Sequence, residues 1–407
     1  MVESAARRLQ GVVEVTPLKQ NRRLSMRYGA HVLVKREDQQ TVRSYKVRGA
    51  YNLISQLGDE ARASGVVAAS AGNHAQGVAR ACSALGVRGR VYLPSRTPKQ
   101  KRDRIAALGG DMIDVVLGGD TYDEASAAAA SYADETGATV VPAFNDSRTV
   151  AGQGTVVREI VEQLGQAPDV VIVPVGGGGL LAGSLAWLSA HCPHTRVIGV
   201  EPAGAASMAA AVYAGEPVTL EDVDTFVDGA AVRRAGELTF AQISAAQPSL
   251  VSVPEGAVCS EMLELYQSDG IIAEPAGAMA TAVLPQLDIE PDSTVVCMVS
   301  GGNNDVSRYA EVVERALVYE GRKHYFLVEF PQEPGALRRF LDEVLGPDDD
   351  IALFEYVKRS NRETGPALVG IELAGADDLP GLLKRMDQAP HRIEHIDPQS
   401  SLFRYLL

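Results

Sequence analysis

The 407-residue sequence has few aromatic side chains and a shortage of positive charge. Phe, Trp and Tyr make up 5% of the residues, and Lys and Arg number 38 against 52 Asp and Glu, which gives a formal net charge of −14. Few rings for base stacking and an excess of negative charge disfavour binding to nucleic acids. The same charge disfavours an anionic membrane surface. We therefore expect neither nucleic acid nor a membrane as a partner.

Cysteine is scarce, and long apolar runs are missing. No stretch approaches the roughly 20 apolar residues that span a bilayer, and residues 1–10 lack the apolar core of a signal peptide. The cysteines form no CxxC pair, and the cluster at 191–194 has no complementary ligand pair, so we expect no metal site. The sequence predicts a cytoplasmic protein whose thiols stay reduced; these are Cys82, Cys192, Cys259 and Cys297.

Glycine is abundant, with 39 residues, and hydrophobic residues make up 46% of the chain. From Val32 to about Ala310, continuous apolar runs alternate with alanine-rich stretches. This alternation predicts an α/β fold of parallel strands joined by helices, and the number of strands favours a core divided into two lobes. We expect strands at 31–35, 66–70, 90–94, 112–116, 139–142, 170–175, 197–200 and 295–300, and helices at 44–57, 74–85, 99–108, 122–136, 150–164, 180–191 and 259–268.

The pattern changes near residue 320, after a helix expected at 311–319. The rest of the chain predicts the order βαββαβ, which is that of a ferredoxin-like fold. About 85 residues are enough for a small separate domain, so we expect two domains, 1–320 and 321–407. The elements expected in the second are strands at 323–330, 351–358, 367–373 and 392–396 and helices at 334–345 and 379–387.

Lys46 lies in the motif SYKVRGA (residues 44–50), which follows an apolar strand and opens an expected helix with Ser44 as N-cap. The positive end of a helix dipole favours a neutral amine. A neutral lysine amine can form a Schiff base with an aldehyde cofactor. A lone lysine is more often a surface residue, so Lys46 gains meaning only together with the motifs that follow.

The motif SAGNHAQG (residues 70–77) joins an expected strand to the next helix. Small residues and free N–H groups at the start of a helix suit a carboxylate. Asn73 offers an amide donor to a phenolate or carbonyl oxygen. The alternative is that Asn73 only caps the helix.

Four consecutive glycines, Gly176–Gly179, stand before Leu180 between an apolar strand and a helix. Glycine lets the backbone come close to a ligand, and the N–H groups of such a loop can hold a phosphate. No Lys-Ser/Thr pair follows, so this is not a Walker loop. Gly177 and Gly179, with Glu201 at the end of the next strand, also approximate a dinucleotide-binding fingerprint. The motif alone therefore leaves NAD binding open.

A fourth motif, VSGGNND (residues 299–305), again follows a buried strand. Ser300 would lie at the carboxyl end of this strand, where open α/β sheets bind ligands. A turn without function is the alternative.

In this order and spacing, the motifs SYKVRGA, SAGNHAQG, VPVGGGGLLAG and VSGGNND resemble the fold-type II pyridoxal-phosphate enzymes. Within them, the match is to the biosynthetic threonine dehydratases (threonine ammonia-lyases), which residues 144–155 (FNDSRTVAGQGT) also resemble. The C-terminal stretch FPQEPGALRRFLDEVL resembles the ACT-like regulatory domain of that family. The resemblance covers nearly the whole chain. It implies a two-lobed, parallel-sheet core like that of the tryptophan synthase β subunit, followed by an ACT-like domain.

The resemblance also implies roles for individual residues. Lys46 would form the Schiff base with pyridoxal 5′-phosphate, Asn73 would donate to its ring hydroxyl, and Ser300 would face its pyridine nitrogen. The cofactor phosphate would be held by Gly176, Gly177, Gly178, Gly179 and the N–H of Leu180. The substrate carboxylate would be bound by Ser70, Ala71, Gly72, Asn73 and His74.

The activity that the resemblance implies is deamination of L-threonine to 2-oxobutanoate and ammonia, the first step of isoleucine biosynthesis. It further implies feedback inhibition by isoleucine, relief by valine, and a homo-oligomer, expected to be a tetramer. Related serine racemases carry a second serine where this chain has Ala71, so dehydration is favoured over racemisation. Ser207 stands where those relatives have an aspartate that helps to hold a cation, which disfavours a cation near Glu201.

Other interpretations stay open at this point. A sibling enzyme would act as a serine dehydratase, serine racemase, threonine synthase or cysteine-synthase-like transferase and would differ in its product. An oxidoreductase would bind a nicotinamide through Gly177, Gly179 and Glu201. A catalytically inactive sensor would bind an amino acid without turnover, and the C-terminal domain could serve for dimerisation alone.

Overall fold

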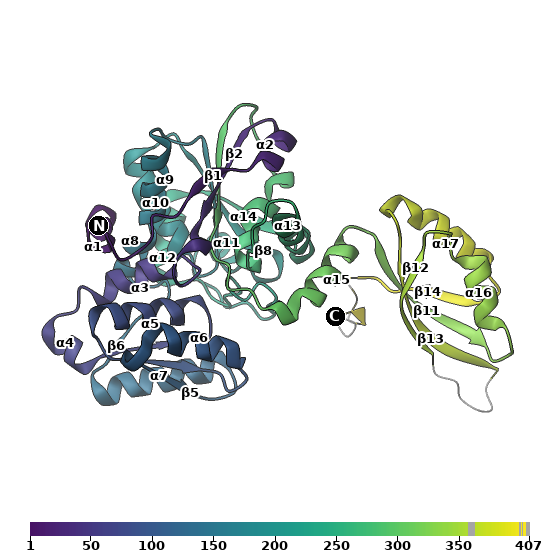
Figure 1. Cartoon of the computed structure of the whole chain (residues 1–407), viewed down its shortest axis with the longest axis horizontal. Coiled ribbons are helices and arrows are strands. Elements are labelled where there is room, and N and C mark those ends of the chain that lie inside the picture. The colour runs from purple at the N-terminus through teal and green to yellow at the C-terminus, as the bar shows by residue number, and fades with distance from the viewer. Residues whose placement is uncertain (357–362, 399, 401, 404–407) are drawn as a thin grey trace. The chain divides into compact units, whose positions relative to one another are not determined.

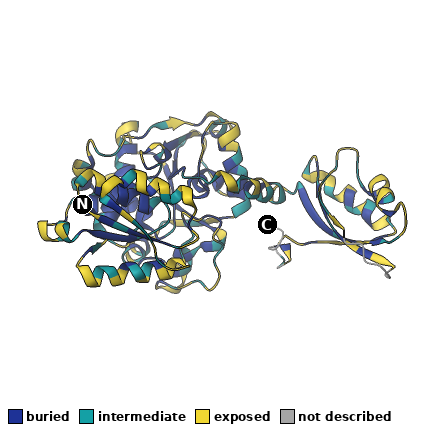
Figure 2. Cartoon of the chain, turned by 60° about the horizontal axis from the view of Figure 1, so that its bottom comes forward, coloured by how far each residue is buried: buried dark blue, intermediate teal, exposed yellow. Residues whose placement is uncertain are grey.

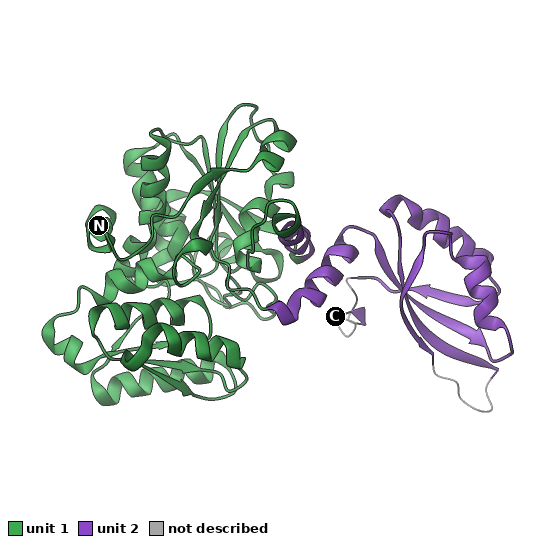
Figure 3. Cartoon of the chain, in the orientation of Figure 1, with its two compact units in different colours: residues 1–255, 264–305 green, residues 256–263, 306–407 purple. Residues whose placement is uncertain are grey.

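The protein is represented by a computed structural model that describes residues 1–356, 363–398, 400 and 402–403. It divides into two compact units (Figure 3). The first comprises residues 1–255 and 264–305, and the second comprises residues 256–263 and 306–407. Each unit has its own apolar core, in which buried residues line the sheets (Figure 2).

The larger sheet of the first unit has six strands in the order β1-β2-β10-β7-β8-β9. All neighbours are parallel except the short β1, which runs antiparallel to β2 at one edge. Every residue of β7 is buried, because its continuous apolar run is covered on both faces. The strands are β1 (Leu18–Gln20), β2 (His31–Arg36), β7 (Val170–Pro174), β8 (Arg196–Pro202), β9 (Ser249–Val253) and β10 (Thr294–Val299).

A second parallel sheet, in the order β5-β4-β3-β6, forms the core of the other lobe of the first unit (Figure 1). Its strands are β3 (Val66–Ala69), β4 (Gly89–Leu93), β5 (Ile113–Leu117) and β6 (Thr139–Val140). The prediction of two parallel-sheet lobes is confirmed. The helices of the first unit are α1 (Val2–Leu9), α2 (Arg22–Tyr28), α3 (Lys46–Ile54), α4 (Asp59–Ser64), α5 (Asn73–Leu85), α6 (Lys99–Gly109), α7 (Tyr122–Thr136), α8 (Ser147–Gln153), α9 (Thr155–Leu164), α10 (Gly179–His191), α11 (Ser207–Ala214), α12 (Glu237–Ala246) and α14 (Pro275–Ala282).

Three details of the first unit differ from expectation. The single helix expected at 150–164 is two helices, α8 and α9, which meet at Gly154, where the chain passes close to Gly183. Strands β1 and β9 were not expected, because one is three residues long and the other carries serines within its apolar pattern. Ser44 does not cap α3: it forms a bridge to Gly301, and the helix begins at Lys46 without a side-chain cap.

The second unit contains a four-stranded antiparallel sheet in the order β12-β13-β11-β14. Helices α16 and α17 pack on it through a core that includes Phe326, Phe340 and Leu382. The expected βαββαβ order is confirmed; the expected strand end at 357–358 lies outside the described residues. The elements are α15 (Tyr309–Tyr319), β11 (Lys323–Pro331), α16 (Ala336–Val344), β12 (Asp350–Tyr356), β13 (Thr364–Glu372), α17 (Leu379–Gln388) and β14 (Arg392–His395), and α13 (Glu255–Gln267) contributes residues 256–263.

In the part of the chain that the structure describes, no helix has the length and apolar character needed to cross a membrane.

Substitution of Gly183 by alanine tests the crossing of α10 over the junction of α8 and α9. A Cβ at Gly183 would overlap the carbonyl oxygen of Val150 and lie 2.7 Å from the backbone nitrogen of Gly154. Because both neighbours are backbone, we expect Gly183→Ala to lower the free energy of unfolding by about 1–3 kcal/mol. Gly58→Ala is the control, since a Cβ there meets nothing within 4 Å. Equal denaturation midpoints for the two variants would contradict the tight crossing.

Candidate active site

Three of the sequence motifs converge at the carboxyl ends of neighbouring parallel strands. Lys46 follows β2, Ser300 follows β10 directly, and the glycine loop 176–179 follows β7. In the sheet, β10 lies between β2 and β7. Parallel strands end at the same edge, so the three motifs meet there, as ligand-binding residues do in open α/β sheets.

Two backbone contacts fix Lys46 next to Ser300. The N–H of Tyr45 donates to the carbonyl oxygen of Ser300 at 3.2 Å. Helix α5 also packs so closely on this segment that a Cβ at Gly77 would lie 3.0 Å from the carbonyl group of Lys46. The ammonium of Lys46 lies 5.2 Å from the centre of the Tyr45 ring, and the lysine is half-buried.

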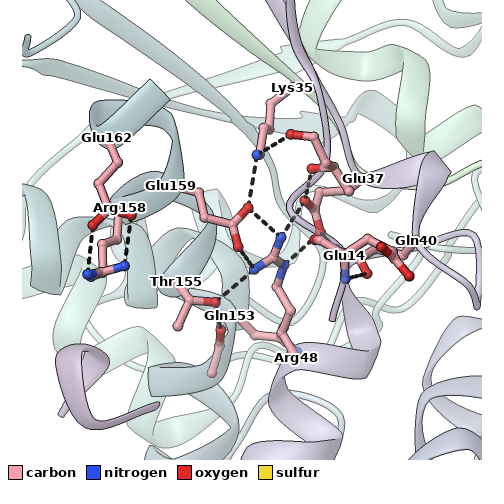
Figure 4. A network of polar contacts seen from close by, with 12 residues as sticks. Glu14, Lys35, Glu37, Gln40, Arg48, Gln153, Thr155, Arg158, Glu159 and Glu162 are labelled. Atoms are coloured by element: carbon pink, nitrogen blue, oxygen red, sulfur yellow. Dashed lines mark hydrogen bonds and ion pairs between the residues drawn. The ribbon is translucent and has the colours of Figure 1, made fainter. Parts of the chain in front are cut away.

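Helix α3, which Lys46 begins, is anchored by a buried network of charges (Figure 4). The guanidinium of Arg48 donates from Nε and Nη2 to the carboxylate of Glu37, both at 2.8 Å. It donates to Glu159 from Nη1 at 2.5 Å and from Nη2 at 2.9 Å. Lys35 Nζ donates to the same Glu159 carboxylate at 2.9 Å. The network therefore joins β2, the turn after it, α3 and α9.

Burial and pairing oppose one another in this network. Burial alone would raise the pKa of Glu37, but the adjacent guanidinium of Arg48 outweighs it and holds that pKa below its usual value. For Arg48, burial alone would lower the pKa, whereas the two carboxylates keep it above its usual value. Burial lowers the pKa of Lys35, and Glu159 only partly offsets this. Glu37 and Arg48 are therefore both charged.

The glycine loop is fixed by packing on its side-chain positions. A Cβ at Gly177 would overlap the ring of Phe144, and one at Gly176 would lie 2.9 Å from the backbone of Ala230. Gly178 has φ +86°, which favours glycine, and Thr239 Oγ1 donates to the carbonyl oxygen of Gly177 at 2.6 Å. The N–H groups in the first turn of α10, which starts at Gly179, have no partner within the helix. They can hold an anion.

Asn73 is brought to the same edge from the second sheet, where it is the first residue of α5 after β3. Its Nδ2 donates to Glu274 Oε1 at 2.6 Å, and its Oδ1 accepts from Asn303 Nδ2 at 2.7 Å. The alternative that Asn73 only caps a helix is wrong, because Asn73 lies inside α5 and its amide contacts residues far away in the sequence.

Ser70, Ala71, Gly72 and Asn73 are half-buried, whereas His74 is buried. The ring of His74 contacts the carbonyl oxygen of Val141 through Nε2 at 2.7 Å, and burial lowers its pKa to about 4, aided by Lys46. The ring is therefore neutral, and Nε2 carries the hydrogen. Nδ1 is then an acceptor, and within the described structure no hydrogen-bond partner reaches it.

Ser300 is buried at the edge of the sheet, and its hydroxyl contacts the carbonyl oxygen of Ala276 at 3.3 Å. This long, weak contact leaves the hydroxyl able to donate to another acceptor. A neutral hydroxyl can donate a hydrogen bond to an uncharged pyridine nitrogen.

Glu201 has a structural role at this edge. Its carboxylate accepts from the backbone N–H groups of Met208 and Ala209 at 2.7 and 2.8 Å, at the start of α11. Burial raises its pKa to about 7. Because both oxygens are engaged, Glu201 is not placed as the ribose acceptor of a dinucleotide site. Among the described residues, no cluster of three or more His, Cys, Asp or Glu could hold a metal ion.

Sequence reasoning gave no role to Glu274, which lies in a stretch that resembles the family, or to Asn303, Thr239 and Arg48. Glu274 directly precedes Pro275, a pattern typical of a helix start, and it is the N-cap position of α14 without a side-chain cap. Asn303 lies in the motif VSGGNND, but the motif did not indicate a role for it. Arg48 lies two residues after Lys46. A charged residue on an otherwise apolar helix face could have indicated a buried and paired charge.

The residues at this edge fit pyridoxal phosphate. The start of α10 suits its phosphate, the amide of Asn73 suits its ring oxygen, and the hydroxyl of Ser300 suits its ring nitrogen. An amine at Lys46 suits its aldehyde.

Removal of the Arg48 guanidinium tests the buried network. Arg48→Met leaves Glu37 without its counter-charge, and we expect a loss of about 3–5 kcal/mol in the free energy of unfolding. In the wild type, the lowered pKa of Glu37 gives stability that is present above its unfolded pKa and lost as pH falls through the folded pKa. In the variant, the largest cause of this lowering is removed, and Lys35 and Thr16 remain to oppose burial. The deficit should therefore be largest at high pH and shrink toward acid pH, as denaturation at several pH values would measure.

Arg158→Met is the matched control for that experiment. Arg158 pairs with Glu3 and Glu162 at 3.0 and 2.7 Å, but its side chain is 27% exposed. Its loss should cost no more than about 1 kcal/mol. Equal losses in the two variants would contradict the importance of the buried network.

Two family models match the chain. Residues 9–301 match the family described as pyridoxal-phosphate dependent enzyme. Residues 314–406 match the C-terminal regulatory domain of threonine dehydratase.

Curated relatives and solved structures agree with these matches. The chain is 63% identical over 408 residues to the biosynthetic L-threonine dehydratase of Mycobacterium bovis, covering 100% of this chain and 95% of that protein. It is 47% identical over 407 residues to the enzyme of that name from Bacillus subtilis, covering 99% and 96%. Threonine deaminase isoform 2 of Solanum lycopersicum, in its processed form, superposes with a TM-score of 0.72 at 38% identity over 77% of this chain and 93% of that one. Maize serine racemase gives 0.71 at 29% identity over 78% and 97%.

The resemblance to the threonine dehydratases and the predicted fold class are therefore confirmed. The interpretation of the glycine loop as a dinucleotide-binding site is wrong. The chain belongs to the threonine dehydratase family of pyridoxal-phosphate dependent enzymes.

Proposed function

We propose that this chain deaminates L-threonine to 2-oxobutanoate and ammonia, as the first step of isoleucine biosynthesis. The observation that carries the proposal is the convergence of Lys46, Asn73, Ser300 and the glycine loop at one edge of the larger sheet. The name of the Mycobacterium bovis relative, which aligns with the whole chain, supports threonine as the substrate.

Each residue of this set would hold a different part of the cofactor. Lys46 would hold the aldehyde through its ε-amine, and Asn73 would donate from Nδ2 to the ring oxygen. Ser300 would face the ring nitrogen, and the phosphate would be bound by Gly176, Gly177, Gly178, Gly179 and the N–H of Leu180.

When bound, pyridoxal phosphate withdraws electrons from Cα of an attached amino acid. The ε-amine of Lys46, exchanged for the substrate amine, would accept the Cα proton. The C–O bond at Cβ would break, and the hydroxyl would take up one proton and leave as water, so that the proton lost from Cα is balanced. The Lys46 amine would return to the aldehyde as the enamine is released, and the enamine would take up one water to give ammonia and the 2-oxo acid without an oxidant.

The substrate would be oriented by residues 70–74. The N–H groups at the start of α5 would hold its carboxylate. His74, the second residue of α5, would take part through its backbone N–H. Its ring would not bind the carboxylate, because Nε2 is engaged with Val141 and Nδ1 can only accept a hydrogen bond. Serine is the alternative substrate, with dehydration or racemisation as the reaction, and Ala71 in place of a second serine favours dehydration.

We propose further that the second unit binds isoleucine as an inhibitor, with relief by valine. A cavity of about 440 Å³ in this unit is lined by both charged and apolar residues. The N–H groups at the start of α16, after its N-cap Gly335, suit the effector carboxylate. Glu333, which pairs with Arg339, offers a carboxylate to its ammonium. Phe330, Leu341 and Phe354 offer an apolar surface for a branched side chain. A catalytically inactive sensor would use the same cavity.

The functional boundary is proposed between residues 1–320 and 321–407, supported by family models that end at 301 and begin at 314. A homotetramer is proposed from the family resemblance. A cytoplasmic location is proposed because the cysteines are scattered along the chain and form no CxxC pair, which suits a reducing compartment.

Replacement of Lys46 tests the proposed reaction. Lys46→Ala should lose at least about 1,000-fold in turnover of L-threonine to 2-oxobutanoate, because both the covalent anchor and the base are removed. It should also lose the visible absorption band of the lysine-bound cofactor. Full turnover in the variant would refute the scheme. Faster formation of pyruvate or D-serine from L-serine in the wild type would favour the alternative.

Introduction of a charge tests the effector cavity. Leu341→Asp, at a side chain that lines the cavity, should raise the isoleucine concentration for half-inhibition by at least about tenfold, because an apolar contact is lost. Val313→Asp is the control, since Val313 is an exposed residue of α15 outside the cavity. Equal responses in the two variants would exclude the cavity. If saturating isoleucine did not change the turnover of the wild type, the proposed inhibition would be refuted and the proposed deamination of threonine would stand.

A further inference from the structure

The amide of Asn73 is held from both sides by partners far away in the sequence. Glu274 Oε1 accepts from Asn73 Nδ2 at 2.6 Å, and Asn303 Nδ2 donates to Asn73 Oδ1 at 2.7 Å. A primary amide has two N–H donors and one oxygen. Rotating this amide by half a turn would place its oxygen against a carboxylate and its NH₂ against another NH₂. The structure therefore permits one orientation, which leaves one N–H of Asn73 for a ligand.

Asn303 is itself oriented by the backbone. Its Nδ2 also donates to the carbonyl oxygen of Val42 at 2.8 Å. Both N–H groups of its amide are then engaged, one with Val42 and one with Asn73. Asn303 cannot turn its oxygen toward Asn73 without losing both hydrogen bonds.

Glu274 reaches Asn73 only because residue 301 has no side chain. A Cβ at Gly301 would overlap Glu274 Oε1, and it would lie 3.2 Å from Asn73 Nδ2. The backbone N–H of Glu274 donates to the carbonyl oxygen of Gly301 at 3.1 Å. Glu274 is 5% exposed and is held against the strand end that carries Ser300.

The surroundings of Glu274 make its charge state sensitive to pH. Burial, aided by the nearby Asp228, raises its pKa to about 7. The hydrogen bond from Asn73, the charge of Lys101 and the backbone of Asn303 act in the opposite direction. Lys101 and Asp228 pair with each other at 2.9 Å, so Lys101 offsets part of the effect of Asp228 on Glu274.

We propose that Glu274 is a positioning residue for the cofactor: its carboxylate fixes the amide of Asn73 so that one N–H points at the cofactor ring oxygen. This rests on the proposed function, in which Asn73 donates to that oxygen. Protonation of Glu274 replaces a charge-assisted hydrogen bond by a weaker neutral one. The electronic environment of the bound cofactor therefore changes in one step near neutral pH.

The test is a pH titration of the visible band of the bound cofactor, over about two pH units on either side of neutrality. Wild-type protein should show one step with a midpoint near the pKa of Glu274, about 7. Glu274→Gln keeps an oxygen that accepts from Asn73 but cannot titrate, so it should bind the cofactor and lose the step. Glu274→Leu removes the acceptor, and its cofactor dissociation constant should rise about tenfold.

Glu201→Gln is the matched control, because Glu201 is a buried glutamate whose pKa is also raised to about 7, but it contacts α11 and not Asn73. It should keep the step. A step that persists in Glu274→Gln, or is lost equally in Glu201→Gln, would overturn the proposal, as would wild-type cofactor affinity in Glu274→Leu. These readouts need no threonine. A wild type that shows the step but does not deaminate threonine would refute the proposed function and leave the role of Glu274 standing.

Discussion

The pairing of Arg48 with two buried carboxylates is the constraint on which the catalytic unit depends. A charge without a partner in the interior costs several kcal/mol, so the guanidinium cannot leave Glu37 and Glu159. These partners lie on the turn after β2 and on α9, whereas Arg48 lies in the first turn of α3. Any shift of α3 would break several charge-assisted hydrogen bonds at once. The network therefore fixes Lys46 relative to the sheet, although it does not touch the reacting atoms.

The two ends of the cofactor site are held by different physical means. The glycine loop is fixed by steric packing, since Phe144 and Ala230 occupy the space where side chains would be. The amide of Asn73 is fixed by hydrogen bonds to Glu274 and Asn303. Packing tolerates a change of pH, whereas a hydrogen bond to a carboxylate does not. The glycine loop is thus held by groups that do not titrate, and the ring-oxygen end is held by a carboxylate that does.

The sequence could predict the parts of the fold and site that depend on local patterns. The apolar run of β7 and the glycines after it predicted a buried strand and a turn into a helix, and both are present, whereas anion binding by that turn stays a prediction. The pairing of Asn73 with Glu274 spans 201 positions, and no local pattern encodes such a contact. The bonds from Arg48 to Glu159 span 111 positions and were missed for the same reason. The break between α8 and α9 depends on the approach of α10, which is also a tertiary contact.

All four cysteines are buried, and they lie in different parts of the fold. Cys82 packs in the core of the smaller sheet, Cys297 lies on β10 of the larger sheet, and Cys259 lies on the segment of α13 that belongs to the second unit. Burial also raises the pKa of the Cys82 thiol to about 12, which suppresses the reactive thiolate. A thiol reagent can therefore modify these residues only after local opening. The rate at which a reagent labels each cysteine therefore measures how often the part of the fold around that cysteine opens.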